Sequence, residues 1–290
     1  MNKNILILGS DGMLGRTIFL YLDSLFPENI WGTTRKKKNQ TKKIFFFNAE
    51  TYQKDFLLIK KNLKKLDYII NCIGILKKDY DKQELVYVNA LFPHLLEKLA
   101  EKNNFKLIHI STDAVFSPLS EKVSESSPVG PIDNYGSSKL LGETTSKNAL
   151  TFRSSFIGLD PINHKGLLEW TLKTPALNGY TNQLWSGCTT IQFAKFCENI
   201  IRNNLFLKLR RQSPIYHFAP LKTLSKYQLI KTFAKLSKKD FAITKATGEK
   251  VIRTLMTNYF DSLSMNEYTS STKEAIRELL LFESNIQGKK

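Results

Sequence analysis

Short apolar runs alternate with amphipathic stretches over the first half of the chain. The runs have the length and composition of buried parallel strands, and the stretches carry apolar residues at helical spacing. The predicted strands are residues 4–9, 30–34, 43–48, 66–75, 106–112 and 149–158. The predicted helices are residues 13–26, 51–66, 84–103 and 134–147. Such alternation implies βαβ units, so we expect an α/β fold with a doubly wound parallel sheet of the Rossmann type.

The alternation loosens after residue 158. Residues 190–203, 224–239 and 271–283 predict further amphipathic helices, and Ser225 is a suitable N-cap for the second of them. We therefore expect a Rossmann domain over residues 1–158, to which residues 183–204 return, and a smaller, discontinuous C-terminal domain over residues 159–290.

The segment GSDGMLG follows the first strand and places Gly9, Gly12 and Gly15 three residues apart where a helix begins. Glycines in such a turn let a pyrophosphate approach the backbone, and the helix N-terminus offers free N–H groups. The spacing differs from G-x-G-x-x-G, but the flanking strand and helix are those that a dinucleotide site requires. We expect Met13 and Leu14 of this turn to lie beside the cofactor as well.

The end of the second strand reads GTTRKKK, where a chain specific for NAD would carry an acidic residue for its ribose. Thr34 and Arg35 stand there instead, and a cation can pair with a 2'-phosphate. The segment favours NADPH as cofactor, with NADH as the alternative. Residues 36–38 are interpreted as a solvated run of charge.

Further cofactor contacts are predicted at the ends of the third and fourth strands. Asn48 follows one of them, and Cys72, Ile73 and Gly74 end the other, where a small residue lets a nicotinamide ribose lie against the sheet. Asn89 is placed within a helix, where its amide either satisfies a backbone group near the active centre or only positions the helix.

Residues at the end of the fifth strand and in the next helix predict carbonyl chemistry. Thr112 ends the strand at the edge where open α/β sheets bind ligands, and Tyr135 and Lys139 share one helix face. Reduction of a ketone needs a proton donor, and a tyrosine suits this role if a nearby cation lowers its pKa. We expect Tyr135 to donate the proton, Lys139 to lower its pKa and Thr112 to orient the carbonyl.

These motifs together resemble the extended short-chain dehydrogenase/reductases, and within them the dTDP-4-dehydrorhamnose reductase branch. The resemblance rests on Gly9, Gly12, Gly15, NCIG, STDAVF and YGSSK followed by Gly142 and Glu143, and covers residues 4–158 and, more faintly, 182–195. It implies catalytic roles for Thr112, Tyr135 and Lys139, with Lys139 also bonding the nicotinamide ribose. It implies NADPH as hydride source, a 4-keto-6-deoxy nucleotide sugar as substrate and a role in surface polysaccharide synthesis.

The resemblance also implies that the second domain mainly binds substrate. The contacts with that substrate and the reaction itself have alternatives. We expect substrate contacts from Asp113, Ala114, Arg153, Ser155 and Trp185, although Arg153 is equally suited to a structural ion pair. Sugar dehydratases of this fold carry two acidic residues directly after the threonine. Ala114 stands at the second of these positions, so we do not expect a dehydratase. An epimerase on the same scaffold and a non-catalytic NADP-binding regulatory subunit remain as alternatives.

The composition narrows the class of protein further. The chain of 290 residues has a net charge of +17, but the lysines are spread over many segments, so we expect a solvated surface and no nucleic acid partner. Three scattered cysteines and four dispersed histidines predict no metal site, and His109 is interpreted as a core residue. No apolar run predicts a membrane span or signal peptide, so we expect a cytoplasmic protein. The sequence is compatible with a homodimer.

Overall fold

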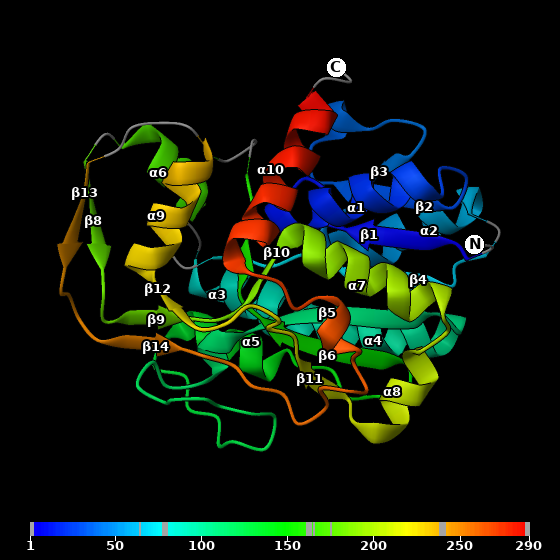
Figure 1. The fold of residues 1–290 in the computed structure, drawn as a ribbon. Coiled ribbons are helices and arrows are strands. Elements are labelled where there is room, and N and C mark those ends of the chain that lie inside the picture. Colours follow the sequence, from blue (N-terminus) through cyan, green and yellow to red (C-terminus); the bar gives the residue numbers. More distant parts are fainter. Residues whose placement is uncertain are drawn as a thin grey trace.

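A seven-stranded parallel sheet forms the centre of the molecule (Figure 1). The computed structural model describes residues 3–63, 65–76, 81–160, 164, 166–174, 176–237 and 242–287. The strand order is β11-β6-β5-β4-β1-β2-β3, so the predicted doubly wound α/β fold is confirmed. The strands are β1 (Ile5–Leu8), β2 (Ile30–Thr34), β3 (Ile44–Phe46), β4 (Tyr68–Asn71), β5 (Lys106–Thr112), β6 (Ala149–Ser154) and β11 (Ile215–His217).

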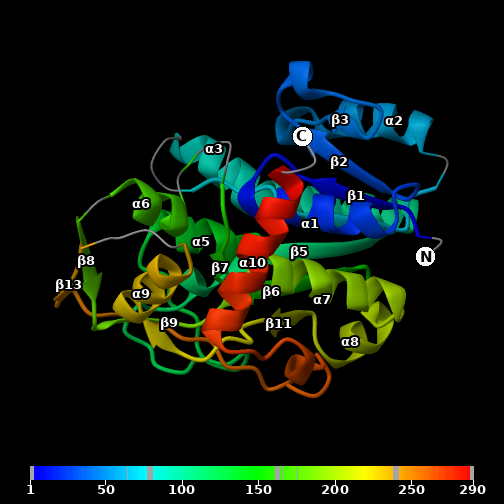
Figure 2. The same ribbon diagram turned by 45° about the horizontal axis from the view of Figure 1, so that its top comes forward.

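Both faces of this sheet are buried, because successive apolar residues of each strand point to opposite faces. Along β1, Ile5 and Ile7 join one core cluster, while Leu6 and Leu8 join another. Figures 1 and 2 show helices on both sides of the sheet. The first cluster includes residues of α1 (Met13–Leu25), α7 (Thr190–Arg202), α8 (Phe206–Gln212) and α10 (Thr272–Gln287), and the second includes residues of α2 (Tyr52–Asn62), α3 (Lys82–Val86) and α4 (Phe92–Asn103).

The helix predicted over residues 84–103 is continuous but not regular. One turn of π-helix, Tyr87–Leu91, joins α3 to α4 and contains the buried Asn89. Such turns are frequent at functional sites. The helix predicted over residues 134–147 is shorter than expected, because α5 (Asn134–Leu141) ends at Gly142.

The C-terminal third contributes more to the sheet than its sequence pattern predicted. Both α8 and β11 continue the alternation, and β11 pairs with β6 at the sheet edge. Three residues are too few for a strand pattern to be recognised. Helix α10 also packs on α7, and Arg16 of α1 pairs with Glu283 at 2.9 Å. We infer that these elements belong to the large domain together with the predicted residues 183–204.

The remaining C-terminal elements form a smaller group beside the large sheet (Figures 1 and 2). Strands β12, β9 and β14 form one small sheet, β13 and β8 form a second, and β10 pairs with β7 in a third. We infer that the smaller domain comprises the elements around the first two of these sheets. The elements not yet given are β7 (Phe156–Ile157), α6 (Leu167–Lys173), β8 (Ala176–Tyr180), β9 (Gln183–Trp185), β10 (Cys188–Thr189), β12 (Leu224–Ser225), α9 (Lys226–Ser237), β13 (Ala242–Ala246) and β14 (Val251–Arg253).

The long segment between β5 and α5 is anchored to the C-terminal part of the chain. Val123 forms a parallel bridge with Leu255, and the N–H of Met256 donates to the carbonyl of Val123 at 2.8 Å. The Glu125 carboxylate accepts from the backbone N–H groups of His217 and Asn258 at 2.8 and 2.9 Å. These bonds explain how a Ser- and Pro-rich segment of this length keeps one path.

Candidate active site

The glycine turn after β1 is built for close approach. Gly9 has φ +77°, a left-handed conformation that side chains rarely adopt, and the N–H of Gly12 donates to the carbonyl of Gly9 at 3.0 Å. A Cβ on Gly15 would lie 2.3 Å from that same carbonyl oxygen. The turn therefore requires glycine at both ends. It places the N-terminus of α1 at the carboxyl edge of the sheet, where the N–H groups can bind an anion.

This turn is tied to the end of β2 by side-chain hydrogen bonds. The N–H of Gly9 donates to the Thr33 hydroxyl at 2.9 Å, and the Ser10 hydroxyl donates to the carbonyl of Thr33 at 3.0 Å. The Thr34 hydroxyl donates to the carboxylate of Asp11. The glycine turn and the end of β2 consequently form one rigid edge.

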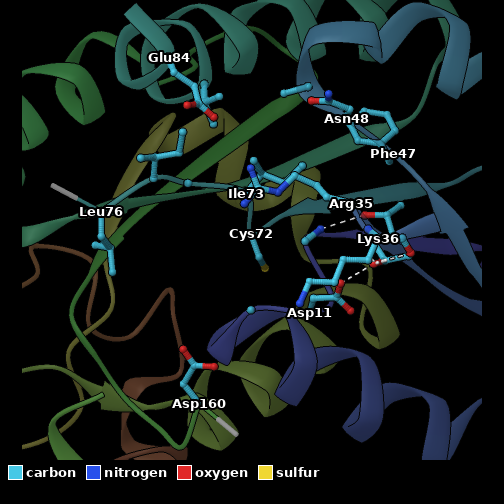
Figure 3. A pocket seen from close by; sticks show the side chains of 18 of the residues that line it. Asp11, Arg35, Lys36, Phe47, Asn48, Cys72, Ile73, Leu76, Glu84 and Asp160 are labelled. Carbon is cyan, nitrogen blue, oxygen red and sulfur yellow. Dashed lines mark hydrogen bonds between the residues drawn. The ribbon is translucent and has the colours of Figure 1, made fainter. Parts of the chain in front are cut away.

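A cavity of about 890 Å³ lies along this edge (Figure 3). Arg35, Lys36 and Asp11 lie together on one side of it, and Leu76 and Asp160 lie away from them. Nine residues predicted to bind the cofactor line the cavity: Gly9, Gly12, Thr34, Arg35, Asn48, Cys72, Ile73, Gly74 and Tyr135.

Five predicted cofactor residues do not line this cavity. Met13, Leu14 and Gly15 belong to the first turn of α1, and the last two are buried against the sheet. Asn89 is fully buried and bonds the backbone of Ile75, accepting from its N–H at 2.9 Å and donating to its carbonyl at 3.0 Å. It therefore satisfies the backbone of Ile75, which lines the cavity, and this is the first of its two predicted roles. Lys139 is 5% exposed and lies behind the cavity wall.

Helix α5 brings Tyr135 to the end of β5. The Asp133 carboxylate accepts from the N–H of Gly136 at 2.8 Å and caps the helix. A Cβ on Gly136 would lie 2.3 Å from the carbonyl oxygen of Ala114, so this glycine lets the helix pack directly on the turn after Thr112. The Thr112 side chain lies close enough to Tyr135 to lower the pKa of its phenol. The predicted juxtaposition of these two residues is present.

Lys139 is not among the main groups that shift the pKa of Tyr135, so its predicted effect on that pKa stays a prediction. Burial raises the pKa of Tyr135 to about 12, Thr112 opposes this rise, and the cation that lowers the pKa is Arg253 of β14. Lys139 instead donates to the carbonyl of Ile110 at 2.6 Å. Burial lowers its own pKa to about 8, against the attraction of Glu143.

Three residues predicted to contact substrate form a connected group next to Thr112. The indole N–H of Trp185 donates to the Ser155 hydroxyl at 2.8 Å, and Ser155 lies close enough to Asp113 to lower the pKa of its carboxyl group. Burial raises the pKa of Asp113, and Arg253 partly offsets that rise. Arg253 donates to the backbone carbonyl of Asp113 at 3.3 Å. Ala114 lies in the same turn and packs against α5.

Arg153 lies in a buried ion pair and does not line the cavity. Its Nε and Nη2 donate to the two oxygens of Glu143 at 2.7 Å each, and both side chains are about 5% exposed. The Ser111 hydroxyl adds a bond to Glu143 at 2.7 Å. Of the two interpretations of Arg153, the structure supports the structural pair.

Several residues of the site were not predicted from the sequence. Asp11, Lys36, Asp160, His164, Trp170 and Lys173 line the cavity, and Arg253 adjoins Asp113. The position of Asp11 inside the glycine turn was a usable signal. The interpretation of Lys36 as part of a solvated run of charge was wrong, because Lys36 lines the cavity beside Arg35. The remaining residues come from segments in which neither periodicity nor motif indicates a site.

The described part of the chain also bears on the predictions about metal sites, membrane spans and His109. Within it, no group of three or more His, Cys, Asp or Glu side chains could hold a metal ion, and no helix has the length and apolar character of a membrane span. His109 is fully buried, its Nδ1 lies 3.1 Å from the amide nitrogen of Asn71, and burial lowers its pKa. It is a core residue, as predicted.

Comparisons with known proteins agree with this architecture. A dTDP-4-dehydrorhamnose reductase from Clostridium acetobutylicum superposes with a TM-score of 0.74 at 20% identity, covering 97% of this chain and 99% of that one. The same enzyme from Bacillus anthracis, in complex with NADP, gives a TM-score of 0.74 at 18% identity with the same coverage. These likenesses establish the shared fold.

Two sequence matches add to the structural ones. Zebrafish (Danio rerio) methionine adenosyltransferase 2 subunit beta is 27% identical over 142 residues, which are 49% of this chain and only 42% of that relative. The profile described as RmlD substrate binding domain matches residues 3–256, well beyond the segments that carried the resemblance. The chain therefore belongs to the RmlD substrate binding domain family.

Proposed function

We propose that the chain is an NADPH-dependent reductase of a nucleotide-linked 4-keto-6-deoxysugar. The observation that carries this proposal is the position of Tyr135, which lies next to Thr112 and lines the same cavity as the glycine turn. A proton donor is thus placed at the end of a groove suited to a dinucleotide. Membership of the RmlD substrate binding domain family supports the choice of substrate class.

The cavity fits the proposed cofactor. Its wall combines the glycine turn, the backbone of residues 72–74 and, at the end of β2, the cations of Arg35 and Lys36. A helix N-terminus favours a pyrophosphate, and the cations favour a 2'-phosphate. When bound, NADPH supplies the hydride for the ketone.

The residues of the chain supply position and a proton. Thr112 would orient the substrate carbonyl through its hydroxyl, and Tyr135 would donate the proton to the oxygen as negative charge develops on it. The raised pKa of Tyr135 keeps this proton on the phenol at neutral pH. Lys139 would hold the Ile110 carbonyl and thereby the end of β5, and it is placed to reach a bound ribose from behind Cys72.

The sugar nucleotide would enter from the side of the smaller domain. Asp113, Ser155 and Trp185 form the connected group next to Thr112, and Trp170 and Lys173 of α6 line the far wall of the cavity. An indole face and an ammonium group suit a nucleobase and a diphosphate. We place this reaction in deoxysugar synthesis for surface polysaccharides.

The test is consumption of NADPH with a panel of nucleotide-linked 4-keto-6-deoxysugars, followed by its absorbance. We expect one NADPH to be oxidised for each sugar reduced, with NADH measured in parallel. An epimerase would interconvert the sugars with no net oxidation. Failure of every sugar in the panel to oxidise either cofactor would contradict the proposal.

The likeness to a protein named as a subunit of a methionine adenosyltransferase favours a second candidate function. In that case the chain would bind a dinucleotide without catalysis and would act as a subunit of another enzyme. Retention of Thr112, Tyr135 and Lys139 argues for the reductase. Pull-down of a stable partner enzyme, together with absence of sugar-dependent NADPH oxidation, would favour the subunit.

A further inference from the structure

An acidic side chain reaches the ribose end of the cavity from the glycine turn after β1. Rossmann folds specific for NAD place an acidic residue at the end of the second strand, where this chain has Thr34 and Arg35. Asp11 of the glycine turn lies there instead, beside Arg35 and Lys36 (Figure 3). The cavity wall at this point therefore carries both signs of charge.

The Asp11 carboxylate is fixed in this position. Its Oδ2 accepts from the Thr34 hydroxyl, and the preceding residue, Ser10, donates to the Thr33 carbonyl through both its N–H and its hydroxyl, at 3.1 and 3.0 Å. Moving the carboxylate away would break its bond to Thr34, while the Ser10 bonds hold the backbone of the turn in place. Each carboxylate oxygen has two acceptor sites, so Asp11 can still accept from a further hydroxyl.

The two forms of the cofactor differ at this point. A ribose 2'-hydroxyl can donate to a carboxylate, whereas a 2'-phosphate is attracted by Arg35 and Lys36 and repelled by Asp11. We propose that Asp11 determines cofactor specificity, because it accepts the 2'-hydroxyl of NADH and limits the preference of the site for NADPH. This inference rests on the proposed function, since it concerns the cofactor of that reaction.

The inference is tested by binding alone, without a sugar substrate. Titration calorimetry with ADP-ribose and with 2'-phospho-ADP-ribose measures the affinity ratio for the wild type, Asp11→Asn and Asp11→Ser. We expect the wild type to prefer the phosphorylated ligand by less than about tenfold. Both variants should raise that preference by about tenfold or more, through tighter binding of the phosphate and weaker binding of the hydroxyl.

A matched control removes the same charge elsewhere on the large domain. Asp23 lies on α1, pairs with Lys43 at 2.6 Å and does not line the cavity, so Asp23→Asn should leave the ratio unchanged. An unchanged ratio in the Asp11 variants, or an equal change in the Asp23 variant, would overturn the inference. Unfolding of both Asp11 variants, detected by circular dichroism, would assign Asp11 a structural role and overturn it as well.

The same titration separates this inference from the proposed function. Binding of both ligands by the wild type, with the same ratio in the Asp11 variants, would overturn only the role of Asp11. Binding of neither ligand by the folded wild type would overturn the proposed function and this inference together.

Discussion

The ammonium group of Lys139 donates a hydrogen bond to the backbone carbonyl of Ile110, 2.6 Å away. Both residues are buried, and the bond joins α5 to the last residues of β5, just before Thr112. The charge of Lys139 is therefore placed beside the end of β5, and burial lowers its pKa to about 8. Its protonation state accordingly affects both activity and stability within an accessible range of pH.

Activity should fall as the pH rises through about 8. Protonated Lys139 holds the end of β5, and a lysine with a pKa of about 8 loses its proton above that pH. We expect the logarithm of kcat/KM to be level below this pH and to fall with a slope of about one above it. Lys106 is also a partly buried lysine, but it begins β5 far from Thr112, so Lys106→Gln should retain the profile. A level profile through about pH 9.5 would contradict this role.

Stability should change with pH in the opposite direction. Between the folded pKa of about 8 and the unfolded value of 10.5, the unfolded state binds more protons at Lys139, so its contribution to the free energy of unfolding rises with pH. From pH 7 to about 9.5, the wild type should gain about 2 kcal/mol relative to Lys139→Met. Urea unfolding of both proteins measures this difference. A parallel pH dependence of the two proteins would show that Lys139 is not buried in its charged form.

Removal of the Tyr135 hydroxyl should separate chemistry from cofactor binding. Tyr135→Phe should lower kcat by about 10² to 10⁴, since the proton donor is lost, while the Kd for NADPH changes by less than about threefold. Steady-state kinetics and fluorescence titration of NADPH provide the two values. Normal turnover by a variant that still binds NADPH would exclude Tyr135 as the proton donor.

The ion pair of Arg153 and Glu143 should matter for folding and little for substrate recognition. Arg153→Met leaves Glu143 buried without its partner and should cost about 3 to 5 kcal/mol in the free energy of unfolding. Replacing both residues by Met should restore most of that loss. A large rise in KM for the sugar without loss of stability would instead support a substrate-binding role for Arg153.

Arg253 connects the smaller domain to the catalytic strand end. It donates to the carbonyls of Asp113 and Phe116 at 3.3 and 3.1 Å and lowers the pKa values of Asp113 and Tyr135 against the effect of burial. Arg253→Gln should therefore lower kcat by about tenfold, and Arg253→Lys by less, because the charge is retained. Equal kcat values for wild type and Arg253→Gln would contradict this role.

Local patterns predicted the Rossmann sheet and part of the cavity wall. Most of these strands have four to seven residues, and together with the helices between them they show strong hydrophobic periodicity. A glycine turn that directly follows a strand and begins a helix indicates a dinucleotide site. The same reasoning placed Thr112 and Tyr135 together, because the carboxyl end of a parallel strand and the start of the helix that follows it lie at the same edge of the sheet.

Long-range contacts account for what was missed. Nothing near Arg253 in the sequence indicates that β14 reaches Asp113, and β11 is too short to show a strand pattern. The pKa of Tyr135 was predicted from its spacing to Lys139, whereas burial and the distant Arg253 act on it in the fold. The catalytic roles and the sugar substrate stay predictions.

Transfer of labelled hydride tests the reductase proposal most directly. The enzyme would be incubated with NADPH carrying deuterium at both C4 positions of the nicotinamide and with a nucleotide-linked 4-keto-6-deoxysugar, and the product would be analysed by mass spectrometry and NMR. We predict one deuterium at C4 of the sugar and one NADP⁺ formed for each product molecule. A product without deuterium, or an altered sugar formed without oxidation of the cofactor, would contradict the assignment as a reductase.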